Sequence, residues 1–128
     1  MTDRRISLPK DMAALDVVLN VPSHGEFRKG LASVAEGYGF HFSEAGCNLP
    51  RDIEEEDHVP WQDVDHAEFY FPGSETLHVP LSDFRRYLAM AVEAEVAARP
   101  EGAAELKALH AAADGWLAAH PLVMAGKA

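Results

Sequence analysis

Two short runs of alternating apolar and polar residues, separated by a turn, constrain the fold of this chain most. Residues 67–71 place Ala67, Phe69 and Phe71 on one face of an extended strand, and residues 77–81 alternate in the same way. Pro72 and Gly73 favour a tight turn between the two runs. The pattern predicts a β-hairpin over about 64–71 and 76–81. Because a lone hairpin is only marginally stable in water, it must pack on helices or gain a third strand, for which residues 40–42 are the candidate.

The segments on both sides of the hairpin show helical periodicity. Apolar residues recur three and four positions apart after Pro9, after a Ser-x-x-Glu capping box at residues 23–26, after Ser82 and after Pro100. The short break at residues 99–102 predicts that the last two helices pack antiparallel. The expected fold class is therefore α+β, with about four helices packed around a small antiparallel β-sheet built on the hairpin.

The length of the chain, 128 residues, predicts a single domain over 1–128. Residues 1–8 and 122–128 are expected to be peripheral or frayed. The single cysteine, Cys47, excludes an internal disulfide. No stretch reads as a leader or a membrane span, so the expected location is cytoplasmic.

The negative charge of the chain is concentrated in one region. Ten of the 21 acids lie between Arg51 and Arg85 in a stretch without Lys or Arg, and the remaining acids balance the 11 basic residues. A focused negative field favours a basic protein partner and disfavours nucleic acid and anionic membrane. Residues 40–60 show no clean period and are expected to form a long irregular loop. The predicted binding surface consists of Asp52, Glu54, Glu55, Glu56, Asp57, Asp63 and Asp65, with Trp61 as its exposed apolar anchor.

Catalytic chemistry has weaker support in the sequence. Adjacent exposed glutamates lack the contrast in environment that separates a general acid from a general base. Cys47 has no nearby cation to stabilise a thiolate, so a structural, half-buried thiol is expected. No recognised metal motif is present, and we expect no metal, no cofactor and no enzymatic activity. An alternative that stays open is a small metal-dependent enzyme that uses His58 and His66 with nearby carboxylates.

Several short motifs in the middle and C-terminal parts of the chain occur in a fixed order. Gly46-Cys47-x-x-Pro50-x-Asp52-Ile53 precedes an acid run, and a hairpin of the form Phe69-Tyr70-Phe71…Glu75…Val79 comes next. Ser82-Asp83-Phe84-x-x-Tyr87-Leu88-x-x-Ala91 follows, before a helix end at Arg99-Pro100-Glu101. Over about residues 26–118, this order resembles the immunity proteins that neutralise ribonuclease toxins in contact-dependent growth inhibition.

The resemblance implies a small, non-catalytic, cytoplasmic protein that binds one basic nuclease toxin domain. The charge pattern agrees with it independently, because ribonucleases present cationic, phosphate-binding clefts that an acidic surface can occupy. The expected protein is a monomer or a weak homodimer and binds neither nucleic acid nor membrane. A further alternative is an acidic adaptor or nucleic-acid-mimicking regulator that binds another basic partner.

Overall fold

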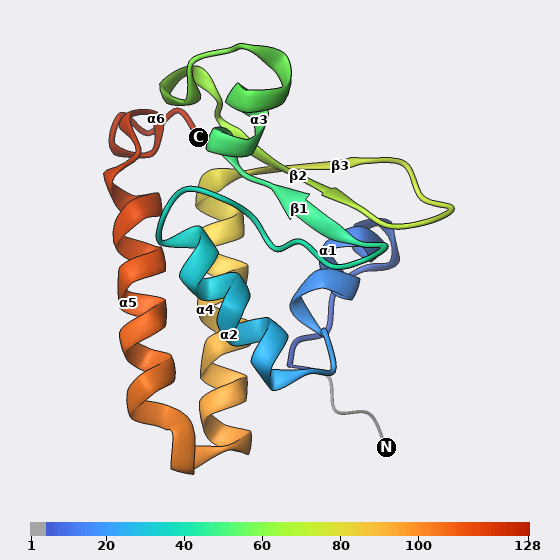
Figure 1. Ribbon diagram of the computed structural model, residues 1–128, viewed down its shortest axis with the longest axis vertical. Coiled ribbons are helices and arrows are strands. Elements are labelled where there is room, and N and C mark those ends of the chain that lie inside the picture. The colour runs from blue at the N-terminus through green and yellow to red at the C-terminus, as the bar shows by residue number, and fades with distance from the viewer. Residues whose placement is uncertain (1–4) are drawn as a thin grey trace.

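In the computed structural model, a three-stranded antiparallel sheet packs against a layer of helices, and residues 5–128 are described (Figure 1). The described residues form six α-helices, namely α1 (Ala13–Leu19), α2 (His24–Val34), α3 (Pro50–Asp57), α4 (Leu81–Ala98), α5 (Ala103–Ala119) and α6 (Pro121–Met124). The sheet has the order β1-β2-β3, with β1 (Gly46–Asn48), β2 (His66–Tyr70) and β3 (Leu77–Pro80). Short 3-10 helices span Lys10–Met12, Trp61–Asp63 and Pro100–Gly102. The predicted α+β class is confirmed, with more helices than the four expected.

The predicted hairpin is present as β2 and β3, in a register that pairs Glu68 with His78. The predicted third strand at residues 40–42 is wrong. The strand that pairs with β2 is β1, in which Cys47 lies opposite Phe69, while His41 contributes only an isolated bridge. The segment Gly46–Asn48 lacks the alternation of a half-buried strand, so pattern alone does not reveal it.

The inner face of the sheet carries the apolar half of the alternating pattern. Ala67, Phe69 and Val79 are buried, and the ring of Phe69 meets that of Phe84 in α4 edge-on, with the centroids 5.5 Å apart. Helix α1 contacts β1 and β2, and α4 contacts β2 and β3. Burial of this face leaves the polar side chains of β2 and β3 on the opposite face, because successive residues of a strand point to opposite sides.

The helix boundaries follow local signals read from the sequence. Ser23 is the N-cap of α2, and its hydroxyl accepts a hydrogen bond from the amide of Glu26, as the capping-box pattern predicts. After α2 the chain turns at Gly37, whose φ of 89° favours glycine. Helix α4 begins at Leu81 with Pro80 as its N-cap residue, two residues earlier than expected from Ser82 as the N-cap. Helices α4 and α5 run antiparallel side by side, as predicted (Figure 1).

Both ends of the described chain are tied to the fold. Residues 1–4 of the predicted lead-in lie outside the described residues, but Ile6 is part of the hydrophobic core. Residues 122–128, expected to be peripheral or frayed, are exposed or partly exposed and have defined contacts. Residues Pro121–Met124 form α6, and the carbonyl of Ala128 accepts hydrogen bonds from the amide and the hydroxyl of Ser82. Within residues 5–128, none of the helices combines the length and apolarity that a membrane span requires.

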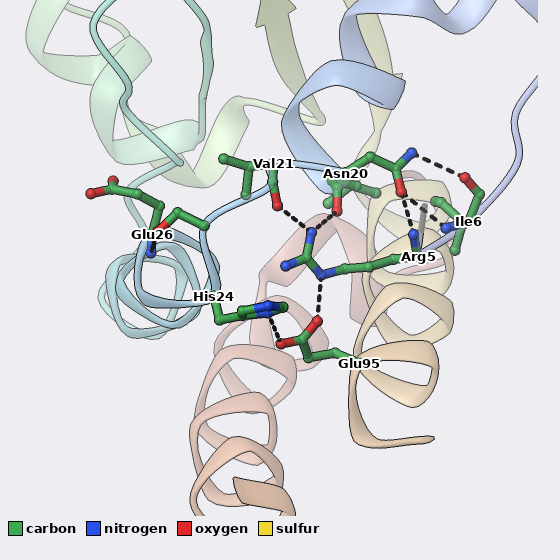
Figure 2. Close-up of polar contacts among 9 residues, drawn as sticks. Arg5, Ile6, Asn20, Val21, His24, Glu26 and Glu95 are labelled. Atoms are coloured by element: carbon green, nitrogen blue, oxygen red, sulfur yellow. Dashed lines mark hydrogen bonds and ion pairs between the residues drawn. The ribbon is translucent and has the colours of Figure 1, made fainter. Parts of the chain in front are cut away.

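A buried ion pair fixes the N-terminal segment against α4 (Figure 2). The guanidinium of Arg5 donates to Glu95 Oε1 at 3.0 Å and to the carbonyl of Val21 at 2.6 Å. The other oxygen of Glu95 lies 2.5 Å from Nδ1 of His24. Arg5 and Glu95 side chains are only 5% and 7% exposed. Burial lowers the pKa of Arg5, and the facing charge of Glu95 opposes that shift.

Replacement of Glu95 by Ala is expected to lower the free energy of unfolding by about 3–5 kcal/mol, because it leaves the buried Arg5 charge without its partner. Urea denaturation followed by circular dichroism measures the loss. The control is Glu93→Ala, an exposed position on the same helix, for which we expect a change within about 0.5 kcal/mol. Equal effects at the two positions would contradict the structural role of the pair.

Candidate functional site

The acidic run does not lie on an irregular loop, as the sequence suggested, but on helix α3. Pro50 occupies the first turn, and the carboxylate of Asp52 accepts a hydrogen bond from the amide of Leu49, the N-cap residue. The helix ends at His58, which adopts the left-handed conformation with φ of 58°. Only Pro50 and Ile53 are buried in this helix, so the sequence has too few apolar positions to show a helical period.

Asp52 has a structural role that its place in the charge run concealed. Its carboxylate accepts hydrogen bonds from the amides of Gly39 at 2.8 Å and Leu49 at 2.9 Å, and it lies 3.1 Å from Nε2 of His41. A Cβ at Gly39 would lie 1.8 Å from the carbonyl oxygen of Cys47, so this close approach requires glycine. Asp52 thus joins the segment after α2 to the start of α3.

An open pocket of about 460 Å³ lies between α3 and the polar face of the sheet. We call it the acidic pocket, and its lining residues are His41, Asn48, Asp52, Glu55, Glu56, Glu68, Tyr70 and Thr76. Four of these side chains are carboxylic acids, and none is Lys or Arg. Carboxylates gathered in a concave, partly desolvated site focus a negative potential more strongly than the same charges on a convex surface. The pocket is therefore suited to bind cationic groups.

Two tyrosines border these acids with their hydroxyl groups protonated. The hydroxyl of Tyr38 donates to Glu55 Oε2 at 2.7 Å, and this hydrogen bond is the main reason that the pKa of Tyr38 is raised. The pKa of Tyr70 is raised mainly by burial, with smaller contributions from neighbouring groups that include Asp52 and Glu56. Both phenols therefore remain neutral hydrogen-bond donors at physiological pH and add no negative charge.

Two of the predicted binding residues, Glu54 and Trp61, contact each other. Glu54 Oε2 accepts a hydrogen bond from the amide of Trp61 at 2.9 Å. Trp61 is not the exposed anchor that the sequence suggested, since its ring is half-buried and lies 5.4 Å from that of Trp116 in α5. The Nε2 atom of His120 lies 3.1 Å from the carbonyl oxygen of Trp61. These contacts connect the end of α3 to the C-terminal helices.

The remaining predicted acids differ in whether they line the acidic pocket. Glu55 and Glu56 are exposed and line the acidic pocket together with Asp52. Asp57, Asp63 and Asp65 are exposed but do not line it. The seven acids thus do not form one uniform surface, because they are spread over α3, the following 3-10 helix and the residues before β2.

Sequence reasoning missed five members of the acidic pocket, namely His41, Asn48, Glu68, Tyr70 and Thr76. A signal for two of them was present, since the hairpin alternation already placed Glu68 and Tyr70 on the face opposite the core. Their proximity to α3 had no sequence signal, because it depends on the pairing of β1 with β2 and on the direction in which α3 leaves β1. His41 joins them through its contacts with Asp52 and Tyr70.

The acids of α3 lie where they weaken their own helix. Glu55, Glu56 and Asp57 occupy its C-terminal end, which is the negative end of the helix dipole, and no basic residue lies in the last turn. Each acid at such a position costs about 0.3–1 kcal/mol. Helix stability therefore does not explain this arrangement.

Cys47 is unsuited to nucleophilic catalysis. The thiol is fully buried in β1, rather than half-buried as expected, and burial raises its pKa to about 12. The amide of Phe40 donates to Sγ at 3.3 Å, which only partly opposes the effect of burial. The thiol is therefore protonated and shielded at neutral pH.

No model of a known protein family matches the chain, and neither does any curated protein or solved structure.

Replacement of Asp52 by Ala should lower the free energy of unfolding by about 1–3 kcal/mol, because the amides of Gly39 and Leu49 lose their acceptor. Thermal denaturation monitored by circular dichroism measures the effect. The matched control is Glu56→Ala on the same helix, which removes an exposed acid and should change stability by no more than about 0.5 kcal/mol. A similar small change at both positions would show that Asp52 does not hold the two segments together.

The raised pKa of Cys47 predicts that its thiol does not react with thiol reagents in the folded protein. We expect a thiol reagent at pH 8 to label Cys47 only through unfolding, with rapid and complete labelling in concentrated urea. The pKa of an unfolded thiol is about 8.5, whereas burial raises the pKa of the folded thiol to about 12. Between these values only the unfolded thiol ionises, so the free energy of unfolding falls as the pH rises. Fast labelling of the native protein would contradict the buried environment.

Proposed function

We propose that this chain is an immunity protein that binds and neutralises a cognate ribonuclease toxin domain through its acidic pocket and the adjoining end of α3. The observation that carries this proposal is the gathering of four carboxylic acids in one open pocket whose lining includes no Lys or Arg. The proposal is also supported by the order of motifs that resembles such immunity proteins, and it places the protein in the cytoplasm, where a delivered ribonuclease meets RNA.

The physical basis of the proposal is charge complementarity. A ribonuclease needs Lys and Arg in its cleft to hold phosphate groups, and these cations are attracted by a pocket of carboxylates. The same pocket would repel RNA, because both carry negative charge. Negative charge is also the only property that the pocket shares with nucleic acid. Carboxylates that bind the cationic cleft would compete directly with substrate phosphates.

Within the predicted set of binding residues, the structure supports a division of roles. Glu55 and Glu56 would make direct ion pairs, because they are exposed and line the pocket. Asp52 and Glu54 would act indirectly by holding α3 in place, since their carboxylates already accept backbone hydrogen bonds. Asp57 would extend the surface at the end of the helix. Direct binding roles for Trp61, Asp63 and Asp65 remain predictions from sequence.

Co-expression with the toxin domain encoded beside its gene tests the proposed class. An immunity protein should restore growth of cells that express the toxin and should co-purify with it. Two results would contradict neutralisation by binding. The protein could co-purify with the toxin without restoring growth, or a variant could lose the ability to restore growth while it still binds the toxin. A basic partner that is not a nuclease would favour the adaptor alternative.

The double substitution Glu55→Gln/Glu56→Gln should lower the association rate constant for the toxin by about tenfold at low salt and should weaken its salt dependence. Glutamine keeps an acceptor for Tyr38 and removes two charges from the unfavourable end of α3, so we expect unchanged or slightly higher stability. Stopped-flow or surface plasmon resonance kinetics across a salt series measure the effect.

The matched control is Glu101→Gln/Glu105→Gln, which removes the same charge at exposed positions where α5 begins, at the end of the molecule away from α3 (Figure 1). This control should change the rate by less than about twofold, because charges beyond a Debye length are screened. Equal effects of the two double variants would mean that net charge, and not the acidic pocket, governs binding.

A further inference from the structure

A cluster of two histidines and one glutamate lies on the polar face of the hairpin. His66 and Glu68 are two residues apart on β2 and therefore point to the same side of the sheet. Strand pairing places His78 of β3 directly opposite Glu68. The Oε2 atom of Glu68 lies 3.3 Å from Nε2 of His66 and 3.7 Å from Nε2 of His78. One ligand atom from each of the three side chains lies within 4.8 Å of the other two.

These separations suit a small metal ion. A tetrahedral ion with ligand bonds of about 2.0–2.1 Å holds its ligand atoms about 3.3–3.4 Å apart, which is close to the two separations measured from Glu68. Two imidazoles and one carboxylate form a donor set that prefers Zn²⁺ and its transition-metal neighbours to Mg²⁺ or Ca²⁺. The two imidazole rings are stacked with centroids 4.5 Å apart, so the two side chains are adjacent, and rotation of the rings about their side-chain bonds would have to tilt the ring planes before both nitrogens face one ion.

A second carboxylate orients the first histidine. Asp65 Oδ1 lies 2.9 Å from Nδ1 of His66. Metal-binding histidines commonly donate their second ring N–H to a carboxylate, which fixes the tautomer and leaves the other nitrogen free to coordinate. The contact with Asp65 therefore presents Nε2 of His66, the atom nearest Glu68, as the ligand.

The cluster is accessible from solvent and rests on rigid elements. The side chains of His66 and Glu68 are 26% and 22% exposed, and that of His78 is 60% exposed. His66 and His78 also line an open pocket of about 490 Å³ beside residues 126–128. The ligands come from two paired strands, so the backbone positions are set before an ion arrives. Three protein ligands with an open side leave a coordination position for water or for a partner's side chain.

We propose that His66, Glu68 and His78 bind one Zn²⁺ ion, with Asp65 as the positioning residue of His66. This site differs from the one that the sequence left open, because it contains His66 but not His58. The inference is independent of the proposed function, since it rests on ligand geometry alone and its test uses no toxin.

Isothermal titration calorimetry of tag-free, chelator-treated protein with Zn²⁺ tests this site, together with the metal content after dialysis. We expect one ion per chain and a higher melting temperature with Zn²⁺ but not with Mg²⁺. His78→Ala should weaken Zn²⁺ binding by more than about 100-fold, and Asp65→Asn should weaken it by about 10–100-fold without changing the stoichiometry. His78 is exposed on the edge strand β3, so its replacement should leave the fold intact, which circular dichroism verifies.

The matched control is His58→Asn, which removes an exposed histidine outside the cluster and keeps a residue type that tolerates the left-handed conformation. Its Zn²⁺ affinity should equal that of the unaltered protein. The absence of stoichiometric binding by the unaltered protein would overturn the proposal. Undiminished binding by a folded His66→Ala/His78→Ala variant, or an equal loss in His58→Asn, would also overturn it by placing the metal elsewhere.

Discussion

The carboxylate of Asp52 is the contact on which the arrangement of the acidic pocket depends. It connects Gly39 and the ring of His41, both in the segment after α2, to Leu49, the N-cap residue of α3. Two backbone amides that would otherwise be unsatisfied receive their acceptor from it. Together with the hydrogen bond from the amide of Arg51 to the carbonyl of Gly37, this contact holds the start of α3 against the segment that follows α2.

Two groups of charges in this protein differ in whether the charge is compensated. Arg5, His24 and Glu95 form a buried network in which charge is compensated, and this network ties the N-terminal segment to the helical layer. The acids at the end of α3 are uncompensated, and they oppose the dipole of the helix that carries them. Proteins keep such locally unfavourable arrangements mainly at functional sites, which is why α3 is the strongest candidate for contact with a cationic partner.

Glu68 links the two sites on the polar face of the sheet. It lines the acidic pocket on one side and lies between His66 and His78 on the other. An ion held by this cluster would neutralise Glu68 and reduce the negative potential of the pocket, so metal occupancy and the binding of a basic partner would oppose each other. Coupling of this kind needs no conformational change, because one carboxylate serves both sites.

The sequence by itself determined the elements whose patterns are local. Alternation predicted the hairpin, the capping box predicted the start of α2, and the short break before α5 predicted antiparallel helices, because burial of one face leaves a period of 2 or 3.6 in the chain. The concentration of acidic residues between Arg51 and Arg85 could also be read directly from the sequence. Only the tertiary structure decided that residues 46–48 form a strand, that residues 50–57 form a helix, and that Asp52 and Glu54 serve the fold. These segments are too short or too acidic to show a period. The proximity of Glu68 to α3 depends on the pairing of β1 with β2, which no local pattern predicts.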